Sequence, residues 1–112
     1  MPMNHPPHPG GMFIEFCLPG TGSTIESAAA HMGLDPGEFT EVCFERAPLT
    51  AEMAVRVSKA FGSTPEAWMR MQTAYDIALA KEALGVAEIE RLSELSEAEL
   101  DAFEVEGLPE TA

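Results

Sequence analysis

Residues 64–81 read TPEAWMRMQTAYDIALAK, and this stretch carries the clearest local structure signal in the chain. Thr64 is suited to cap a helix start, and Pro65 suits the first helical position, where its missing N–H costs no hydrogen bond. Large apolar side chains then recur at steps of three and four residues, which places them on one helical face. They are Trp68, Met71, Tyr75 and Leu79. The sequence therefore predicts a helix from Pro65 to about Leu84 with one buried face.

A second helix is predicted just upstream, over residues 51–61. Thr50 is placed to cap this helix, and Gly62 is placed to end it. Its predicted inward side chains are Met53, Ala54, Val57 and Phe61. Its charged side chains are predicted to lie on a solvated face, and they are Glu52, Arg56 and Lys59.

Together the two helices contain the string EMAxRxxKAFGxxPExWxxxQxAYD between Glu52 and Asp76, which resembles the HigA/VapI-type antitoxins. These are small helix-turn-helix proteins of the lambda-repressor-like (XRE) class. The resemblance begins at NHPPHPG, residues 4–10, and runs without a gap to about Lys81. It implies an all-α fold in which residues 1–84 form a five-helix lambda-repressor-like helix-turn-helix domain. Residues 85–112 would then be an added acidic helical extension.

The N-terminal residues 1–11 contain four prolines, two glycines and two histidines. This composition predicts an extended arm or an ordered loop rather than a helix. The His5-x-x-His8 spacing has no third ligand nearby, so no metal site is predicted there. The register of the resemblance makes the apolar run Met12–Leu18 the first helix.

A tight turn at Gly33 is predicted to separate two short helices. Residues 23–24 offer a Ser or a Thr to cap the first of them, and Asp35 with Pro36 begins the second. Ala29 and Gly33 have the spacing of a helix-turn-helix, in which a small residue at the helix crossing is followed by the turn glycine. The apolar residues of the first helix are Ile25, Ala28, Ala29 and Met32. Those of the second are Phe39, Val42 and Cys43.

The outward side chains of the second helix are those that such a protein presents to DNA base edges. They are Pro36, Gly37, Glu38, Thr40, Glu41, Phe44, Glu45 and Arg46. Apart from Arg46 at the helix end, none has the donor pair with which Arg, Asn or Gln reads a purine. Three glutamates would face phosphates, and a like-charge pair at about 5 Å costs roughly 1 kcal/mol even in bulk water. This composition argues against tight duplex binding by the recognition helix.

Two residues at the end of that helix leave alternatives open. Arg46 is the only cation nearby, and its position suits an interaction with the helix dipole. Phe44 stands where a hydrated side chain is expected, so it either turns inward or marks a protein contact.

The net charge of −13 is divided unevenly along the chain. Residues 1–84 contain 10 acidic and 5 basic side chains, a balance of −5, and residues 85–112 contain 9 and 1, a balance of −8. DNA-binding domains usually show a basic face, because neutralising phosphates supplies much of the affinity. The balance here favours a basic protein partner over nucleic acid.

The extension begins at Gly85, where the composition changes. Four apolar residues recur there every three positions among glutamates, and they are Val86, Ile89, Leu92 and Leu95. Ser96 and Glu99 have the spacing of a capping box. One or two acidic amphipathic helices are therefore predicted. They would complete the core or a dimer, meet a basic partner, or lie over the protein's own helix-turn-helix.

No catalytic residue, metal site or cofactor is predicted, because no nucleophile–base spacing, phosphate loop or paired metal ligands is present. Cys17 and Cys43 are predicted to be reduced core residues. With no apolar run long enough for a membrane and no signal peptide, a soluble, cytoplasmic protein is expected.

The resemblance implies an antitoxin that binds and neutralises a small basic RNase toxin, forms a homodimer and represses its own operon by binding DNA. The surplus length of the last family helix would make the dimer contact, for which Ile77, Leu79 and Leu84 are the candidates. Two alternatives remain: a stand-alone XRE-type transcription regulator, and a helix-turn-helix relic used only for protein–protein contact.

Overall fold

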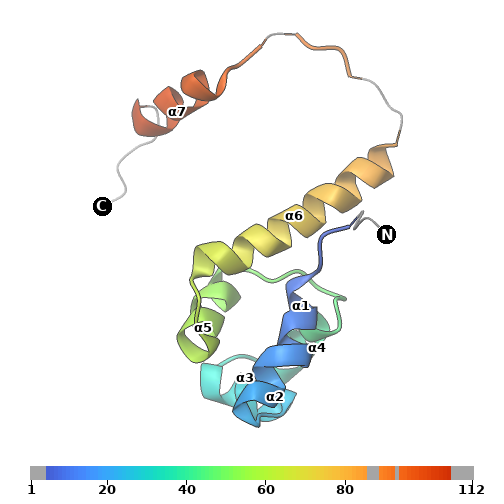
Figure 1. The fold of residues 1–112 in the computed structure, drawn as a ribbon, viewed down its shortest axis with the longest axis vertical. Coiled ribbons are helices and arrows are strands. Elements are labelled where there is room, and N and C mark those ends of the chain that lie inside the picture. Colours follow the sequence, from blue (N-terminus) through green and yellow to red (C-terminus); the bar gives the residue numbers. More distant parts are fainter. Residues whose placement is uncertain (1–4, 86–88, 93, 107–112) are drawn as a thin grey trace.

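A computed structural model of the chain describes residues 5–85, 89–92 and 94–106. Every regular element in these ranges is helical, which confirms the all-α class (Figure 1). The elements are α1 (Pro9–Met12), η1 (Phe13–Cys17), α2 (Leu18–Thr21), α3 (Ile25–Met32), α4 (Pro36–Cys43), α5 (Ala51–Phe61), α6 (Pro65–Leu84) and α7 (Glu97–Glu106). None of the helices among the described residues combines the length and apolar character needed to cross a membrane.

The first helix of the domain begins earlier than predicted. α1, the π-helical turn η1 and α2 follow one another without a break and end at Gly22, whose φ is 67°. The prediction that residues 1–11 form an extended arm is therefore wrong for Pro9–Gly11, which are helical. The physical reason is a cap: the Nδ1 of His8 accepts the N–H of Gly10 at 2.9 Å, and Pro9 occupies the first helical position.

His8 also fixes the position of that helix. Its Nε2 lies 3.2 Å from the carbonyl oxygen of Ala47, which accepts a hydrogen bond only, so the ring donates there. Its ring makes an edge-to-face contact with that of Tyr75 in α6, with ring centroids 4.9 Å apart and planes at 87°. One buried, neutral imidazole thus joins the first helix, the α4–α5 connection and α6. Ahead of it, His5 lies 3.2 Å from Glu82 at the far end of α6.

The core is centred on Phe13, which is fully buried. Its ring lies 5.0 Å from that of Trp68 and 5.4 Å from that of Phe39, so α6 and α4 meet on the first helix. The indole N–H of Trp68 donates to the carbonyl of Gly62 at 3.1 Å. The predicted apolar faces of α3, α4 and α5 are buried, with Ile25 and Phe61 only partly covered.

The buried face of α6 differs from the predicted one at two positions. Leu79 is 44% exposed, so the apolar face reaches solvent beyond Tyr75. Gln72, by contrast, is buried, and its Oε1 accepts the backbone N–H of Leu49 at 2.7 Å. Its amide nitrogen donates to Asp76 at 2.9 Å. A buried amide with both ends paired replaces an apolar side chain here.

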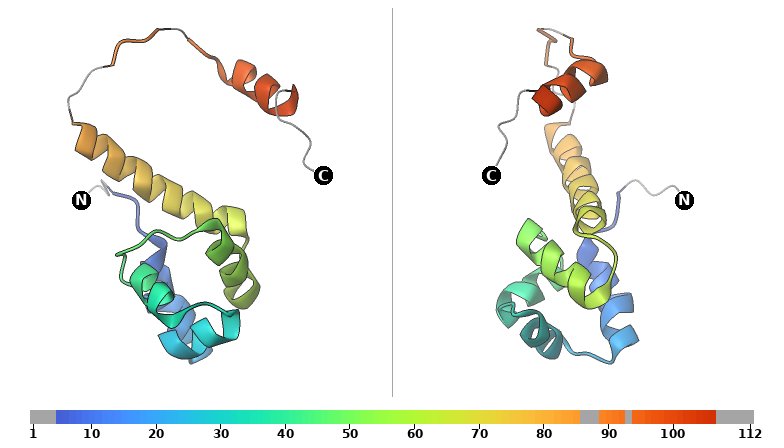
Figure 2. Two further views of the ribbon diagram at one scale, coloured as in Figure 1. Left: turned by 180° about the vertical axis from the view of Figure 1, so that it is seen from behind. Right: turned by 90° about the vertical axis from the view of Figure 1, so that its left-hand side faces the viewer.

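In the extension, the capping box at the start of α7 is confirmed. Ser96 Oγ accepts the N–H of Glu99 at 3.1 Å, and the Glu99 carboxylate accepts the N–H of Ser96 at 3.3 Å. α7 follows α6 in the chain and stands apart from the other helices (Figures 1 and 2). The division of the chain into a domain of residues 1–84 and an extension stays a prediction.

The three-residue apolar repeat before α7 forms no helix in residues 89–92 and 94–96. Ile89 is 82% and Leu92 99% exposed, so no apolar surface covers them. Without such burial, a short helix does not offset its nucleation cost. Val86 lies outside the described residues.

The first helix crosses the end of α4 at Gly10, where a side chain has no room. A Cβ there would lie 2.2 Å from the carbonyl oxygen of Val42 and 2.7 Å from that of Cys43. We expect Gly10→Ala to lower the free energy of unfolding by about 3 kcal/mol, because the backbone of the first helix or of the end of α4 must move to make room.

Gly11→Ala is the matched control, because the nearest atom to its Cβ is a flexible carboxylate oxygen 3.8 Å away. Because alanine has a higher helix propensity than glycine, Gly11→Ala is expected to raise the free energy of unfolding by up to about 1 kcal/mol. Urea unfolding of both variants measures the difference. Equal midpoints would show that the helix crossing is misplaced.

Candidate nucleic-acid interface

α3 and α4 meet at a left-handed turn. Thr24, rather than Ser23, caps α3: its Oγ1 accepts the N–H of Ser27 at 3.0 Å, and Ser27 Oγ accepts the N–H of Thr24 at 2.9 Å. Gly33 follows α3 with φ 72° and ψ 28°. The next N–H, that of Leu34, donates to the carbonyl of Ala29 at 2.8 Å, and Ala29 is fully buried. This places Ala29 at the helix crossing and Gly33 in the turn.

Arg56 holds the turn from α5, a role that the sequence analysis missed. Its Nη1 donates to the carbonyl of Met32 at 2.8 Å, and its Nε donates to Glu52 at 3.2 Å. A Cβ on Gly33 would lie 2.8 Å from the same Nη1. The Arg56 side chain is 41% exposed, in line with the predicted solvated face, but the prediction did not include its hydrogen bond to Met32. Its guanidinium donates a hydrogen bond to the last carbonyl of α3.

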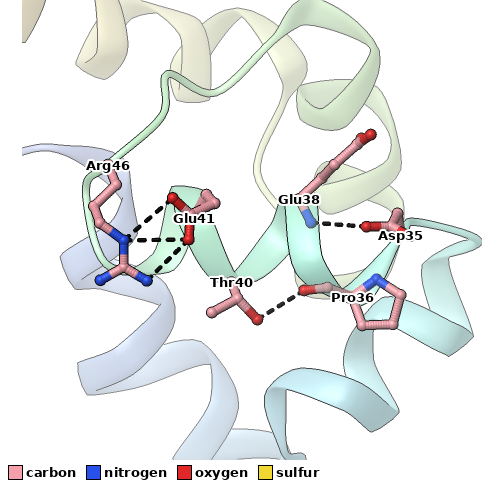
Figure 3. A network of polar contacts seen from close by, with 6 residues as sticks. All are labelled: Asp35, Pro36, Glu38, Thr40, Glu41 and Arg46. Atoms are coloured by element: carbon pink, nitrogen blue, oxygen red, sulfur yellow. Dashed lines mark hydrogen bonds and ion pairs between the residues drawn. The ribbon is translucent and has the colours of Figure 1, made fainter.

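The outer face of α4 begins at an Asp cap. The carboxylate of Asp35 accepts the N–H of Glu38 at 2.9 Å, and Pro36 occupies the first turn (Figure 3). Thr40 turns back and donates its hydroxyl to the Pro36 carbonyl at 2.7 Å. Pro36, Gly37 and Glu38 are exposed, whereas Thr40 and Glu41 are partly covered. No described side chain on this face, before Arg46, carries a positive charge.

Arg46, which follows α4, is already engaged by a carboxylate of that helix. Its Nη2 donates to Glu41 at 2.9 Å, and its Nε lies 3.2 Å from both oxygens of that carboxylate (Figure 3). The hydrogen bond to Arg46 holds the pKa of Glu41 below its usual range and raises the pKa of Arg46. The only cation at the end of α4 is thereby neutralised internally.

The side chain of Phe44 points toward solvent, since 51% of it is exposed. The guanidinium of Arg46 lies 5.3 Å from the centre of its ring. This face holds three negative charges, those of Glu38, Glu41 and Glu45, and one positive charge, that of Arg46. Its chemistry is an apolar ring surrounded by acidic groups rather than a set of base-reading donors.

The dimer candidates lie elsewhere. Ile77, Leu79 and Leu84 occupy the C-terminal half of α6, where they are 49%, 44% and 55% exposed. The structure does not bring them together with the outer face of α4. Their exposure leaves an apolar surface on α6 beyond the core.

The two cysteines are free thiols. Burial, with Cys17 nearby, raises the pKa of Cys43 to about 11, and burial also raises the pKa of Cys17. Both thiols are therefore protonated at neutral pH, which makes them poor nucleophiles. Among the described residues, no three His, Cys, Asp or Glu side chains form a group that could hold a metal ion.

A capped α3, a left-handed glycine turn and a short α4 packed on a common core define a helix-turn-helix protein. No protein-family model matches the chain. The chain is 32% identical over 75 residues to virulence-associated protein I of Dichelobacter nodosus, covering 67% of this chain and 69% of that protein. It is 30% identical over 92 residues to the uncharacterized HTH-type transcriptional regulator YddM of Escherichia coli, covering 82% and 97%.

Solved structures give the same result. Antitoxin GraA superposes with a TM-score of 0.73 at 30% identity, covering 79% of this chain and 98% of GraA. The Pseudomonas aeruginosa antitoxin HigA with the higBA promoter gives 0.73 at 26% identity, covering 80% and 100%. The chain belongs to the HigA/VapI-type antitoxin family of helix-turn-helix proteins. These relatives are antitoxins and helix-turn-helix regulators, not enzymes.

The ion pair between Glu41 and Arg46 allows a test of the DNA-facing surface of α4. Glu41→Gln removes one negative charge and also frees Arg46, whereas Glu38→Gln removes one negative charge only. We expect Glu41→Gln to raise affinity for duplex DNA about tenfold at ~50 mM salt, and to add about one to the salt slope. Fluorescence anisotropy over a salt series measures both. If the two variants behave alike, Arg46 does not face the duplex.

Proposed function

We propose that this chain is an antitoxin that binds and neutralises a small basic RNase toxin. The observation that carries the proposal is membership of the antitoxin family combined with a net charge of −13. An acidic surface speeds encounter with a basic protein, and it covers a basic RNA-binding groove so that the substrate is excluded.

DNA-binding autorepression is the weaker half of the proposal. It is supported by similarity to the antitoxin HigA that was solved with the higBA promoter. The acidic outer face of α4 and the engagement of Arg46 by Glu41 oppose strong phosphate contacts. We therefore infer weak binding to promoter DNA that needs low salt.

A second candidate function is that of a stand-alone transcription regulator. The observation that favours it is the similarity to YddM, 97% of which is matched. Tight, specific binding to a promoter without any basic protein partner would favour this candidate over the antitoxin. Absence of both activities would leave a helix-turn-helix used for protein contact.

The partner prediction is tested by the gene environment. A small basic protein encoded beside this gene should form a complex with the full chain and lose its mRNA-cleaving activity in a cell-free translation assay. The association rate should fall steeply between ~50 and ~200 mM salt, because opposite net charges steer the encounter. No complex at the lower salt would refute the antitoxin proposal.

The proposed homodimer forms through the exposed apolar end of α6. Ile77→Glu should convert the dimer to a monomer, because the carboxylate would be buried without a partner. Val55→Glu is the matched control, since Val55 is 43% exposed on α5, outside this surface. Light scattering coupled to gel filtration reads the mass. A dimer that survives Ile77→Glu places the contact elsewhere.

A further inference from the structure

A groove of about 280 Å³ lies between the α4–α5 connection and α6. Glu45 and Pro48 line one side, and Tyr75, Asp76 and Leu79 of α6 line the other. Two carboxylates therefore share the groove with an aromatic ring and aliphatic side chains. Its size falls below the range typical of drug-sized ligands and suits a single side chain.

Both carboxylates keep free acceptor capacity. One oxygen of Asp76 accepts the amide of Gln72 at 2.9 Å, and none of the described residues donates to the other oxygen. The same described set contains no hydrogen bond or ion pair to the carboxylate of Glu45. Arg46 also lines the groove, but its guanidinium is engaged by Glu41. The groove is therefore acidic, with its internal cation already paired.

Glu45 occupies a backbone position that its side chain does not favour. Its φ is 64°, and α4 ends there as the Arg46 N–H donates to the Glu41 carbonyl at 2.8 Å and the Glu45 N–H donates to the Val42 carbonyl at 3.0 Å. Glycine is the usual residue at this position of a helix end, because it has no Cβ to strain. Glycine at this position would thus relieve the backbone strain, and strain of this kind is typical of binding sites.

A guanidinium fits this combination better than other groups. Its planar fork donates to two carboxylates at once, and its face stacks on an aromatic ring. Charge complementarity then favours an arginine-bearing protein surface over an acidic or neutral one.

We propose that the groove between Glu45 and Asp76 receives an arginine side chain from the basic protein partner. This inference rests on the proposed antitoxin function and assigns the partner's anchor point. It places protein recognition beside the end of α4, on the helix that a DNA-binding relative would turn toward bases.

The first experiment uses an alanine-based peptide with one central arginine, titrated into the isotopically labelled full-length protein at low salt. Backbone amide shifts should appear in residues 45–48 and 72–79. The same peptide with citrulline, which has the shape of arginine without its charge, should bind about fivefold more weakly. Shifts confined to residues 89–106, or equal affinity for both peptides, would overturn the assignment.

Glu45→Gly separates binding from folding. It should weaken arginine-peptide binding about fivefold while raising Tm by about 5 °C, because the strained position is relaxed. Asp76→Asn removes the negative charge on the α6 side of the groove, and it should weaken arginine-peptide binding by a similar factor. Glu26→Gln, a charge change on the exposed side of α3, should leave binding unchanged. Unaltered peptide affinity in both groove variants would refute the proposal.

The same variants distinguish this inference from the function on which it rests. If the neighbouring basic protein binds wild type and Glu45→Gly equally well, the groove is not the anchor and the antitoxin proposal stands. If the arginine peptide binds in the groove but no basic protein forms a complex, the groove proposal stands and the antitoxin proposal fails. A loss of basic-protein affinity of about tenfold in Glu45→Gly supports both.

Discussion

The arrangement of the domain depends on one buried imidazole. His8 is 3% exposed, and its two ring nitrogens make different hydrogen bonds. Nδ1 accepts the first free N–H of the opening helix, and Nε2 donates to the carbonyl of Ala47, 39 residues away. The second bond locates the connection between α4 and α5, and the edge-to-face contact with Tyr75 locates α6. Both hydrogen bonds need the neutral ring in a single tautomer, so the contact orients as well as joins these elements. Phe13 can reach Phe39 and Trp68 because the helix that carries it is held in this way.

Features fixed by neighbours in sequence were predictable, whereas those fixed by distant partners were not. Thr50, Thr64 and Asp35 cap their helices as expected, because a cap needs only the N–H groups of the next turn. The contacts of Gln72 and Arg56 join backbone groups 23 and 24 residues away, and periodicity carries no information about them. The repeat at Ile89 and Leu92 shows the converse limit, since a helical pattern without a surface to cover it does not fold.

The candidate interface shows how far a scaffold and its surface chemistry can diverge. The turn at Gly33 and the packing of α4 are those of a helix-turn-helix, and they follow from a small set of local rules. The ion pair between Glu41 and Arg46 depends instead on side chains that the fold leaves free to vary. Family resemblance therefore predicts where the helix lies better than it predicts what the helix contacts. Of the residues on that face, the sequence left Arg46 and Phe44 open, and the structure pairs Arg46 with Glu41 and exposes half of Phe44.

Trp68 has a practical consequence for observing this molecule. It is the only tryptophan in the chain, it is 6% exposed, and its indole N–H is bonded to Gly62 in the centre of the domain. Residues 85–112 contain neither tryptophan nor tyrosine. Tryptophan emission therefore arises from Trp68 in the helical domain, and the extension contributes no tryptophan signal of its own. With a partner that itself lacks tryptophan, a spectral change on binding marks a change in the surroundings of Trp68.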